Sequence, residues 1–490
     1  MRYKVFLGSI LFLGIVVIIL AQFSIPTIFG ADGYLHIRMA NFLRQYGPHY
    51  NFHWARYSVF AQHFADKDFL YHVLLVPFTF LSDIFWGAKL SACLFTAMFY
   101  LGFWLVLRRY CSQKKLIPFF LLAFFCSAPF LVAITQARNM VIVLALTLFY
   151  IDALVRKKPR VLFALAAVYA LTHVSSPYLL LYALLAEGVR FLNEREFNWK
   201  SIWATALGLL AGFLLHPNFP NNFLIFYLNG VLVPIFALKW GLELGAEFFP
   251  TDTRQFVLGY PLILIGLLAL IILSLNQAKK PKTQTQIWLS LSGLFFVFSF
   301  FSQRYLVHAY PLILVALASY FSDCQAHKGL TKQAKPWPAV RMAGIILVFV
   351  LLGYNAYKDF RQRAASERIY NQHYEAVGKL MAAHLPAGEV VFHANWSDAQ
   401  FFIGLNPQDD YFVTLDPIYM YWWDPRLYNL YRDIAFGRTG DPYAALKEVF
   451  SVRYGYASKN YFSRLISQIR QDARFEVMAE DGFGLIFRLN

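Results

Sequence analysis

The first long polar stretch of the chain opens with an acidic residue, in the run ADGYLHIR from Ala31 to Arg38. This stretch follows an apolar run long enough to cross a membrane, so Asp32 is expected at the membrane surface. An ionisable side chain at the end of a span is costly and is therefore a functional candidate. Its carboxylate could act as a general base or as a metal ligand. Asp is also a favoured helix N-cap, and this structural alternative stays open.

Two further acids, Asp66 and Asp68, lie two residues apart in the same polar stretch. In a loop, this spacing allows two carboxylates to chelate one hard divalent cation, and Mg²⁺ or Mn²⁺ would be that ion. A solvated charge run is the alternative. The polar side chains of the outer segments also supply candidates for substrate binding: His36, Arg38, His72, His173 and Asp252.

Arg138 and Arg304 stand in short polar turns between apolar runs. A guanidinium group binds phosphate oxygens through two parallel hydrogen bonds, so these arginines indicate a phosphate or diphosphate lipid head group. Snorkelling of the side chains toward membrane head groups is the structural alternative.

The elements that position these residues are predicted from composition. Of the 490 residues, 58% are hydrophobic and 15% are charged, against about 45–50% and about 25% in soluble domains. Many segments reach the roughly 20 apolar residues that a spanning helix needs. The net charge is +16, but the basic residues gather in short clusters between apolar runs, which is typical of cytoplasmic loops. We therefore predict a polytopic membrane protein and no nucleic-acid partner.

Placing the basic clusters inside predicts about eleven transmembrane helices, a cytoplasmic N-terminus and an extracytoplasmic C-terminus. The large outer loops are then residues 26–85 and 216–255. Residues 69–86 are apolar enough to span, but a span there would move the first basic cluster outside. We interpret them as an interfacial or re-entrant helix. The basic clusters are residues 108–115, 156–160, 190–200, 279–282 and 328–341.

A helix is predicted to begin at Asp32 and to stop before Gly47-Pro48. Leu35 and Met39 share one face of this helix, whereas Tyr34 and Arg38 share the other. That pattern predicts an amphipathic helix suited to the membrane interface.

The last apolar run ends near Tyr354, which divides the chain into a transmembrane domain, residues 1–357, and a soluble extracytoplasmic domain, residues 358–490. Strand and helix patterns alternate in the second part and predict a small α/β domain. None of the four cysteines lies beyond residue 324, so this domain cannot contain a disulfide. The predicted strands are Val390–His393, Tyr411–Thr414 and Gly484–Arg488, and the predicted helices are Ala444–Phe450 and Phe462–Ile469.

The sequence resembles the GT-C superfamily of integral membrane glycosyltransferases and, more distantly, the catalytic subunits of oligosaccharyltransferases. The resemblance rests on the layout of the chain and on two short runs. In the first run, Asp32 is followed six residues later by Arg38, and in the second, FSQRY, Arg304 enters a span. It implies that Asp32 is the catalytic or metal-binding acid and that Arg304 binds the phosphate of a lipid donor. It also implies that Glu247 is the acid of the second outer loop and a further candidate metal ligand.

The sequence departs from the oligosaccharyltransferase pattern in one place that bears on metal use. No acidic pair follows the turn from Gln136 to Asn139. The resemblance also includes GT-C enzymes that use polyprenyl-phosphate monosaccharides and need no such metal site, so it leaves the metal requirement open.

We expect an inverting hexosyl- or pentosyltransferase of the plasma (inner) membrane, acting in cell-envelope glycan biosynthesis. It would move a sugar from a polyprenyl-phosphate or polyprenyl-diphosphate donor to a lipid, glycan or protein acceptor outside. One alternative is an oligosaccharyltransferase or glycan ligase. An alternative of another class is a flippase or transporter, but the ionisable residues gather at the outer ends of spans, which favours surface chemistry.

Overall fold

The computed structural model describes residues 2–112, 114–275, 280–327 and 339–490, and the chain forms two compact units. Unit 1 comprises residues 1–25, 91–213 and 245–365, and unit 2 comprises residues 26–90, 214–244 and 366–490. Most of the predicted basic cluster 328–341, and Lys279, lie outside the described residues. The predicted division at residue 357 stays a prediction, because the compact units are assembled from discontinuous segments.

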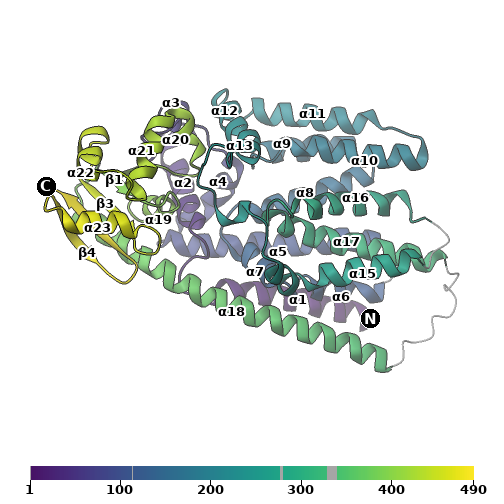
Figure 1. Cartoon of the computed structure of the whole chain (residues 1–490). Coiled ribbons are helices and arrows are strands. Elements are labelled where there is room, and N and C mark those ends of the chain that lie inside the picture. Colours follow the sequence, from purple (N-terminus) through teal and green to yellow (C-terminus); the bar gives the residue numbers. More distant parts are fainter. Residues whose placement is uncertain (1, 113, 276–279, 328–338) are drawn as a thin grey trace. The chain divides into compact units, whose positions relative to one another are not determined.

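Unit 1 is built from helices (Figure 1). Two long helices, α5 (Ile84–Tyr110) and α18 (Ala339–His384), contribute residues to both units. The other elements of unit 1 are α1 (Arg2–Gln22), η2 (Lys114–Leu116), α6 (Ile117–Ala123), α7 (Ala128–Thr135), α8 (Met140–Val155), α9 (Pro159–Ala170), α10 (Tyr178–Glu194), α11 (Trp199–Leu214), η4 (Ala246–Phe248), α14 (Thr253–Gly259), α15 (Pro261–Leu275), α16 (Thr283–Phe298) and α17 (Arg304–His327).

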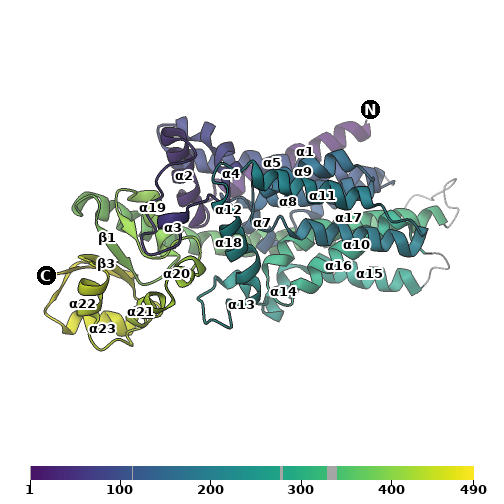
Figure 2. The ribbon, with the colours of Figure 1, turned by 90° about the horizontal axis from the view of Figure 1, so that it is seen from above.

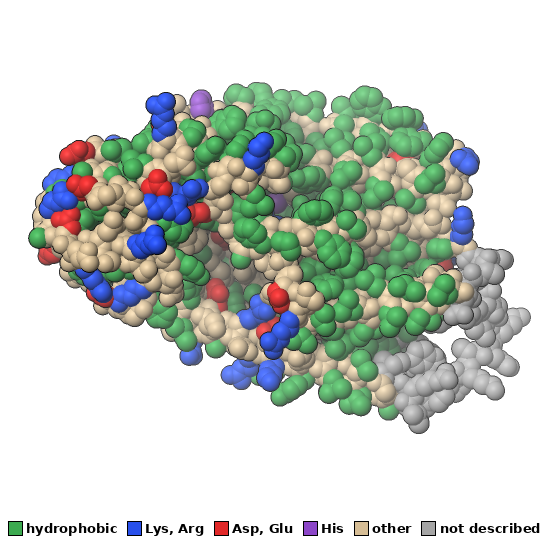
Figure 3. Space-filling view, viewed as in Figure 1, with side chains coloured by type: hydrophobic (Ala, Val, Ile, Leu, Met, Phe, Trp, Pro, Cys, Tyr) green, Lys and Arg blue, Asp and Glu red, His purple; other side chains and the backbone are tan. Residues whose placement is uncertain are grey.

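Apolar helices make this a multi-pass membrane protein, but the predicted count of eleven spans is not confirmed. In the described part of the chain, three helices are long and apolar enough to cross a membrane, or up to five if each bent pair of helices is one span. Several apolar runs instead form helices of 10–17 residues, such as α8 and α9, which are shorter than the roughly 20 residues of a typical span. Hydrophobic side chains spread over the visible surface of the unit 1 helices (Figure 3).

The segment 69–86 forms two short helices followed by a break. These are α4 (Phe69–Leu75) and η1 (Val76–Phe80), and α5 begins only at Ile84. The combined helix Phe69–Phe80 is too short to span, because a span needs about 20 residues. Its length fits the interfacial or re-entrant helix predicted from the sequence.

The C-terminal part of unit 2 contains a five-stranded mixed sheet in the order β2-β1-β3-β5-β4. β1 pairs in parallel with β2 and β3, while β5 pairs antiparallel with β3 and β4. Helix α23 packs against β3 and β4 (Figure 2), and it buries Leu465 and Ile469, one helical turn apart. The strands are β1 (Val390–His393), β2 (Asp410–Tyr411), β3 (Tyr454–Ser458), β4 (Phe475–Glu480) and β5 (Gly484–Leu489); the helical elements are α19 (Asp398–Leu405), α20 (Ile418–Trp423), α21 (Pro425–Ala435), α22 (Pro442–Ala444), η5 (Ala445–Val449) and α23 (Ser463–Gln471).

The structure confirms the predicted strands at Val390–His393 and Gly484–Arg488 and places the other predicted strand at Asp410–Tyr411. The sequence did not predict β3, the central strand. Gly455 interrupts the strand-forming residues of this segment, because a glycine inside a strand weakens it. In the sheet, however, Gly455 pairs with Phe487, and a Cβ at Gly455 would lie 2.3 Å from that ring. The aromatic side chain occupies the space that the missing side chain leaves.

The first outer loop is built into this sheet. The backbone of Tyr411 donates a 2.7 Å hydrogen bond to the carbonyl of Trp54, and Ala55 forms a parallel bridge with Tyr411. The indole of Trp54 donates to the carbonyl of Pro407 at 2.8 Å, and His53 contacts Asp410 at 2.7 Å. The loop thus extends the edge of the sheet beyond β2 and stabilises that edge.

The helix predicted after Asp32 is confirmed as α2 (Asp32–Tyr46), and it ends at Gly47 with φ of 78°. Its expected role as an amphipathic interfacial helix is wrong. Leu35 and Met39 on one face are buried, and so are Tyr34 and Asn41 on the other. The hydroxyl of Tyr34 donates to Glu375 at 2.6 Å, which satisfies the polar face inside the protein. The remaining helices of unit 2 are α3 (Phe60–His63), α12 (Asn221–Tyr227), η3 (Leu228–Leu232) and α13 (Val233–Phe236).

The close contact between α2 and α19 gives a stability prediction. A Cβ added to Gly404 would lie 2.6 Å from Cβ of Tyr34 and 2.9 Å from its backbone. We expect Gly404→Ala to lower the free energy of unfolding by about 1–3 kcal/mol through overpacking, although Ala is the better helix former by about 1 kcal/mol. Thermal unfolding of the detergent-purified full chain measures this change. Gly482→Ala is the control, because nothing lies within 4 Å of a Cβ there, and equal melting temperatures of the two variants would contradict the prediction.

Candidate active site

The side chain of Asp32 lies at the N-terminal end of α2. Ala31 occupies the N-cap position and Asp32 is the first helical residue, so Asp32 is not the cap. An acidic side chain in the first turn interacts favourably with the positive end of the helix dipole. His36 lies one turn later on the same side of the helix, and the carboxylate of Asp32 acts electrostatically on its ring.

Behind Asp32, three buried side chains form a hydrogen-bonded row. Nδ1 of His36 lies 2.8 Å from Nε2 of His72, and Nδ1 of His72 lies 2.6 Å from Oδ2 of Asp66. His36 comes from α2 and His72 from α4, helices that pack together in unit 2 (Figure 1). The exposed fractions are 5% for His36, 1% for His72 and 4% for Asp66. The row is therefore shielded from solvent, where its electrostatic interactions are stronger than in water.

Burial and pairing together set the charges in this row. Burial by itself raises the pKa of Asp66, but His72 and the amide of Asp68 hold the pKa of this carboxyl below its usual value. Burial, assisted by His72, lowers the pKa of His36 to about 3. At neutral pH, Asp66 is an ionised hydrogen-bond acceptor and His36 is neutral.

The second outer loop supports Asp66 from the other side. The backbone amide of Asp66 donates to Oδ1 of Asn218 at 3.2 Å, and Nε2 of His216 lies 3.0 Å from the carbonyl of Asp66. The amide of Asn218 donates to Nδ1 of His216, so the proton of this imidazole is on Nε2 and points at Asp66. The sequence could not assign these contacts, because 150 residues separate His216 from Asp66.

The expected metal site at Asp66 and Asp68 does not fit the donors that the structure presents. Oδ2 of Asp66 contacts His72 and Oδ1 accepts from the amide of Asp68. The carboxylate of Asp68 pairs with Lys67 at 3.0 Å. Glu247 belongs to the other unit. Across the described residues, no group of three or more His, Cys, Asp or Glu side chains is arranged to hold a metal ion.

Arg38, predicted to bind substrate, lies where α2 meets α19. Its Nε and Nη2 donate to the carbonyl of Gly404 at 3.0 and 2.7 Å. Gly404 is in the last turn of α19, whose negative dipole end favours a cation. This contact gives Arg38 a structural function, and its contact with substrate stays a prediction.

A second cluster lies in unit 1, around Arg304 at the start of α17. Nη2 of Arg304 pairs with Oε1 of Glu247 at 2.8 Å, and its guanidinium lies 4.4 Å from the ring centre of Phe248. The neighbouring turn holds this loop in place, since Ser302 donates to the carbonyl of Glu247 at 2.6 Å. Nε of Arg304 is buried, and no acceptor within the described chain reaches it. Such a donor is ready for an anion.

Arg138 joins this cluster electrostatically. Burial raises the pKa of Glu247, but Arg304 and Arg138 outweigh burial and lower it below the usual value. Glu247 is therefore an anion that pairs with Arg304 and is stabilised electrostatically by Arg138, and the cluster carries an excess of positive charge. The structure brings together Arg138 and Arg304, which the sequence named separately as phosphate ligands.

The other two candidates of unit 1 have local structural partners. His173 contacts the hydroxyl of Ser175 at 2.7 Å and accepts from its amide at 3.1 Å. Asp252 is the N-cap of α14 and accepts from the amide of Gln255 at 3.1 Å. Their roles in substrate binding stay predictions.

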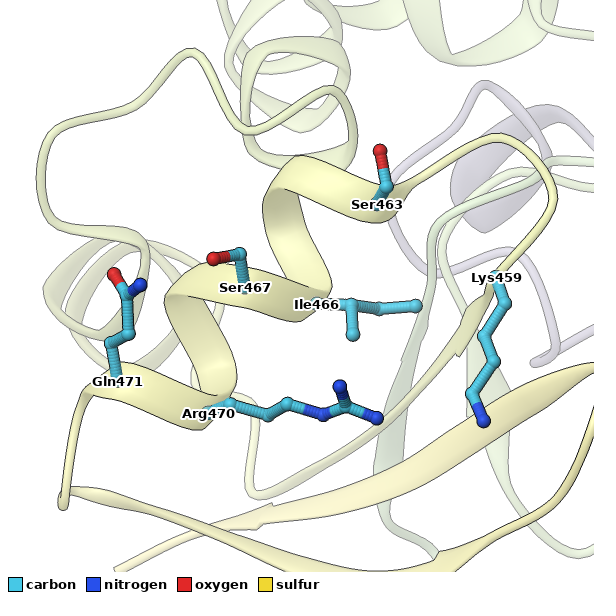
Figure 4. Close-up of a pocket in the computed structure, with 6 residues that line it drawn as sticks. All are labelled: Lys459, Ser463, Ile466, Ser467, Arg470 and Gln471. Atoms are coloured by element: carbon cyan, nitrogen blue, oxygen red, sulfur yellow. The ribbon is translucent and has the colours of Figure 1, made fainter.

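A pocket of about 380 Å³ lies on the C-terminal α/β part of unit 2, beside α23 (Figure 4). Lys459 and Arg470 at its rim both pair with Glu480. None of the predicted site residues lines it, so we do not assign the proposed chemistry to this pocket. Its lining consists of Lys459, Ser463, Ile466, Ser467, Arg470 and Gln471.

No protein-family model and no curated protein sequence matches the chain. Solved structures do match it. The apo oligosaccharyltransferase from Archaeoglobus fulgidus superposes with a TM-score of 0.66 at 11% identity, over 92% of this chain and 69% of that chain. ArnT from Cupriavidus metallidurans bound to undecaprenyl phosphate has a TM-score of 0.63 at 14% identity, over 98% of this chain and 97% of that chain.

The arabinofuranosyltransferase AftD from Mycobacteria matches with a TM-score of 0.51 at 13% identity, over 98% of this chain but 40% of that chain. All three structures are GT-C glycosyltransferases. The chain therefore has the GT-C fold over most of its length, which confirms the resemblance inferred from the layout and the two short runs.

The low pKa of Asp66 predicts a pH dependence of stability. A carboxyl whose pKa is lower in the folded than in the unfolded chain stabilises the fold above its unfolded pKa, here near 3.8, and loses this contribution as the pH falls. We expect Asp66→Asn to lower the free energy of unfolding by about 1–3 kcal/mol at pH 7. The difference from wild type should shrink below pH 4. Thermal unfolding of both proteins across this range is the measurement, and a difference that does not depend on pH would contradict the prediction.

Proposed function

We propose that this chain, which shares the fold of GT-C glycosyltransferases, transfers a sugar from a polyprenyl-phosphate lipid to an acceptor outside the membrane. A monosaccharide donor, a plasma-membrane location, a cytoplasmic N-terminus and an extracytoplasmic C-terminal domain belong to the same proposal. The acceptor is a lipid, a glycan or a protein.

The observation that carries this proposal is the arginine cluster of unit 1. Two guanidinium groups that act on one carboxylate leave an excess positive charge at the start of an apolar helix, and Nε of Arg304 is an unused buried donor. A phosphate matches this arrangement in charge and in hydrogen-bonding geometry. The fold supports it, since the matching ArnT structure contains undecaprenyl phosphate. In this proposal the phosphate displaces Glu247 as the partner of Arg304.

The chemistry requires a proton acceptor and a stabilised leaving group. The hydroxyl oxygen of the molecule that receives the sugar forms a bond to the anomeric carbon of the donor sugar. The bond from that carbon to the phosphate oxygen breaks at the same time. Asp32 takes the proton of the hydroxyl as general base. The electron pair leaves with the polyprenyl phosphate, whose charge Arg304 and Arg138 offset. Attack from the face opposite the phosphate inverts the anomeric configuration.

Replacing Asp32 or Arg304 tests these assignments. We expect Asp32→Asn to reduce transfer from radiolabelled polyprenyl-phosphate sugars by about 10²–10⁴-fold, because an amide cannot take the proton. Arg304→Gln should reduce transfer by a similar factor by removing charge from the leaving group. The measurement is product formation in membranes that contain each variant, with lipid, glycan and protein acceptors tried separately.

Asp433→Asn and Arg254→Gln make the same chemical changes at half-exposed and exposed positions and should retain wild-type transfer. Transfer by Asp32→Asn at the wild-type rate would remove Asp32 from the chemistry. A wild type that moves no label from any donor but carries labelled lipid across vesicles would favour a transporter. Transfer of a preassembled glycan alone would favour a glycan ligase.

Metal removal is a separate test. Because both oxygens of Asp66 already have hydrogen-bond donors, we expect transfer to persist in EDTA at more than half of its rate in buffer. The measurement is transfer by purified protein before and after chelation. Loss of transfer in EDTA and its recovery with Mg²⁺ or Mn²⁺ would show that an ion takes part.

A further inference from the structure

For a neutral His72, the row Asp66–His72–His36 has one consistent arrangement of protons. Ionised Asp66 can only accept, so Nδ1 of His72 carries a proton and donates it. Nε2 of a neutral His72 is then a lone pair, which accepts from Nδ1 of His36 at 2.8 Å. Nε2 of His36 is left as a lone pair at the end of the row. The carboxylate thus fixes the tautomers of two imidazoles at once.

This arrangement can carry a proton from Nε2 of His36 to His72, toward Asp66, without leaving a charge on His36. A proton that binds Nε2 of His36 allows the proton on Nδ1 to pass to Nε2 of His72. His36 then remains neutral with its tautomer reversed, and the positive charge rests on His72. That imidazolium lies 2.6 Å from the carboxylate of Asp66, which stabilises it. The low pKa of His36 agrees with a residue that passes a proton on and does not hold it.

Asp32 is the group that can supply such a proton. It lies one helical turn before His36, and its carboxylate raises the pKa of His36 against the larger effect of burial. We propose that His36, His72 and Asp66 form a proton relay behind Asp32, and this proposal rests on the proposed function. The relay takes from Asp32 the proton that came from the hydroxyl of the sugar-receiving molecule, and it holds this proton on His72 until the products leave. The proton then returns by the same path to Asp32 and to water, so no net proton is stored.

Two features of the site favour a relay over a simple buried polar contact. Three ionisable side chains in a row are costly to bury, and a structural contact needs only one hydrogen-bonded pair. The support of Asp66 by His216 and Asn218 also holds its carboxylate toward His72. The charged or titratable groups that act on His36 are Asp32 on α2, His72 and Tyr71 on α4, and Asp66 and Lys67 in the loop before α4.

The relay predicts a defined spectroscopic state. In full-length protein labelled with ¹⁵N in the histidine rings, His36 and His72 should both carry their proton on Nδ1 at pH 7. Asp66→Ala should abolish this state, because it removes the acceptor that holds the proton on Nδ1 of His72. His36→Gln and His72→Gln assign the signals. A His36 protonated on Nε2 in the wild type, or tautomers unchanged in Asp66→Ala, would overturn the proposal without any measurement of activity.

The kinetic test uses His72→Gln, which keeps a hydrogen-bonding side chain but cannot carry a proton. We expect kcat for sugar transfer to fall about 10- to 100-fold, within the range of proton-transfer catalysis, with KM changed less than about twofold. A defect of folding alone would lower the amount of folded protein, which thermal unfolding of His72→Gln measures.

His63→Gln makes the same substitution at an exposed position of the same loop and should match the wild type. Equal kcat for wild type and His72→Gln would overturn the relay while leaving the proposed function intact. A wild type without any transfer would instead overturn the proposed function, and the role of the relay with it.

Discussion

The burial of the Asp66 carboxylate is the constraint on which the candidate site depends. A buried anion is unstable unless hydrogen-bond donors surround it. Here His72 and the amide of Asp68 supply these donors, while His216 and Asn218 fix the backbone of Asp66. Satisfying one charge therefore brings together two outer loops that are far apart in the sequence. It also sets the rotation of α4, since His72 must face both Asp66 and His36.

The position of Asp32 follows from how α2 is anchored. Tyr34 bonds to Glu375, Arg38 bonds to the carbonyl of Gly404, and α2 and α19 approach so closely that only glycine fits at position 404. These contacts bury both faces of a helix whose sequence resembles a surface helix. A rigidly held first turn can keep a carboxylate in place through a reaction, which a loop at a membrane surface could not do as well.

The two clusters have complementary electrostatic properties. The row in unit 2 ends in lone pairs and carboxylates, which accept protons, whereas the cluster of unit 1 presents an excess of guanidinium groups, which bind anions. Sugar transfer from a lipid phosphate needs both: a site for the acceptor's proton and a site for the departing phosphate. Glu247 keeps the charged side chain of Arg304 paired when no anion is bound.

The sequence by itself determined the features that depend on local pattern. Apolar composition predicted the membrane helices, the residues from Asp32 to Gly47 predicted α2, and the short runs at Asp32 and Arg304 indicated the GT-C fold. It did not determine the partners of charged groups. Asp66 and Asp68, two residues apart, suggested a shared metal ion, but in the fold Asp66 bonds to His72 and Asp68 to Lys67. The number of long apolar helices and the burial of α2 were likewise decided by tertiary structure. Local pattern sets which backbone conformation is favourable, whereas the partner of a buried charge depends on segments that meet only when the chain folds.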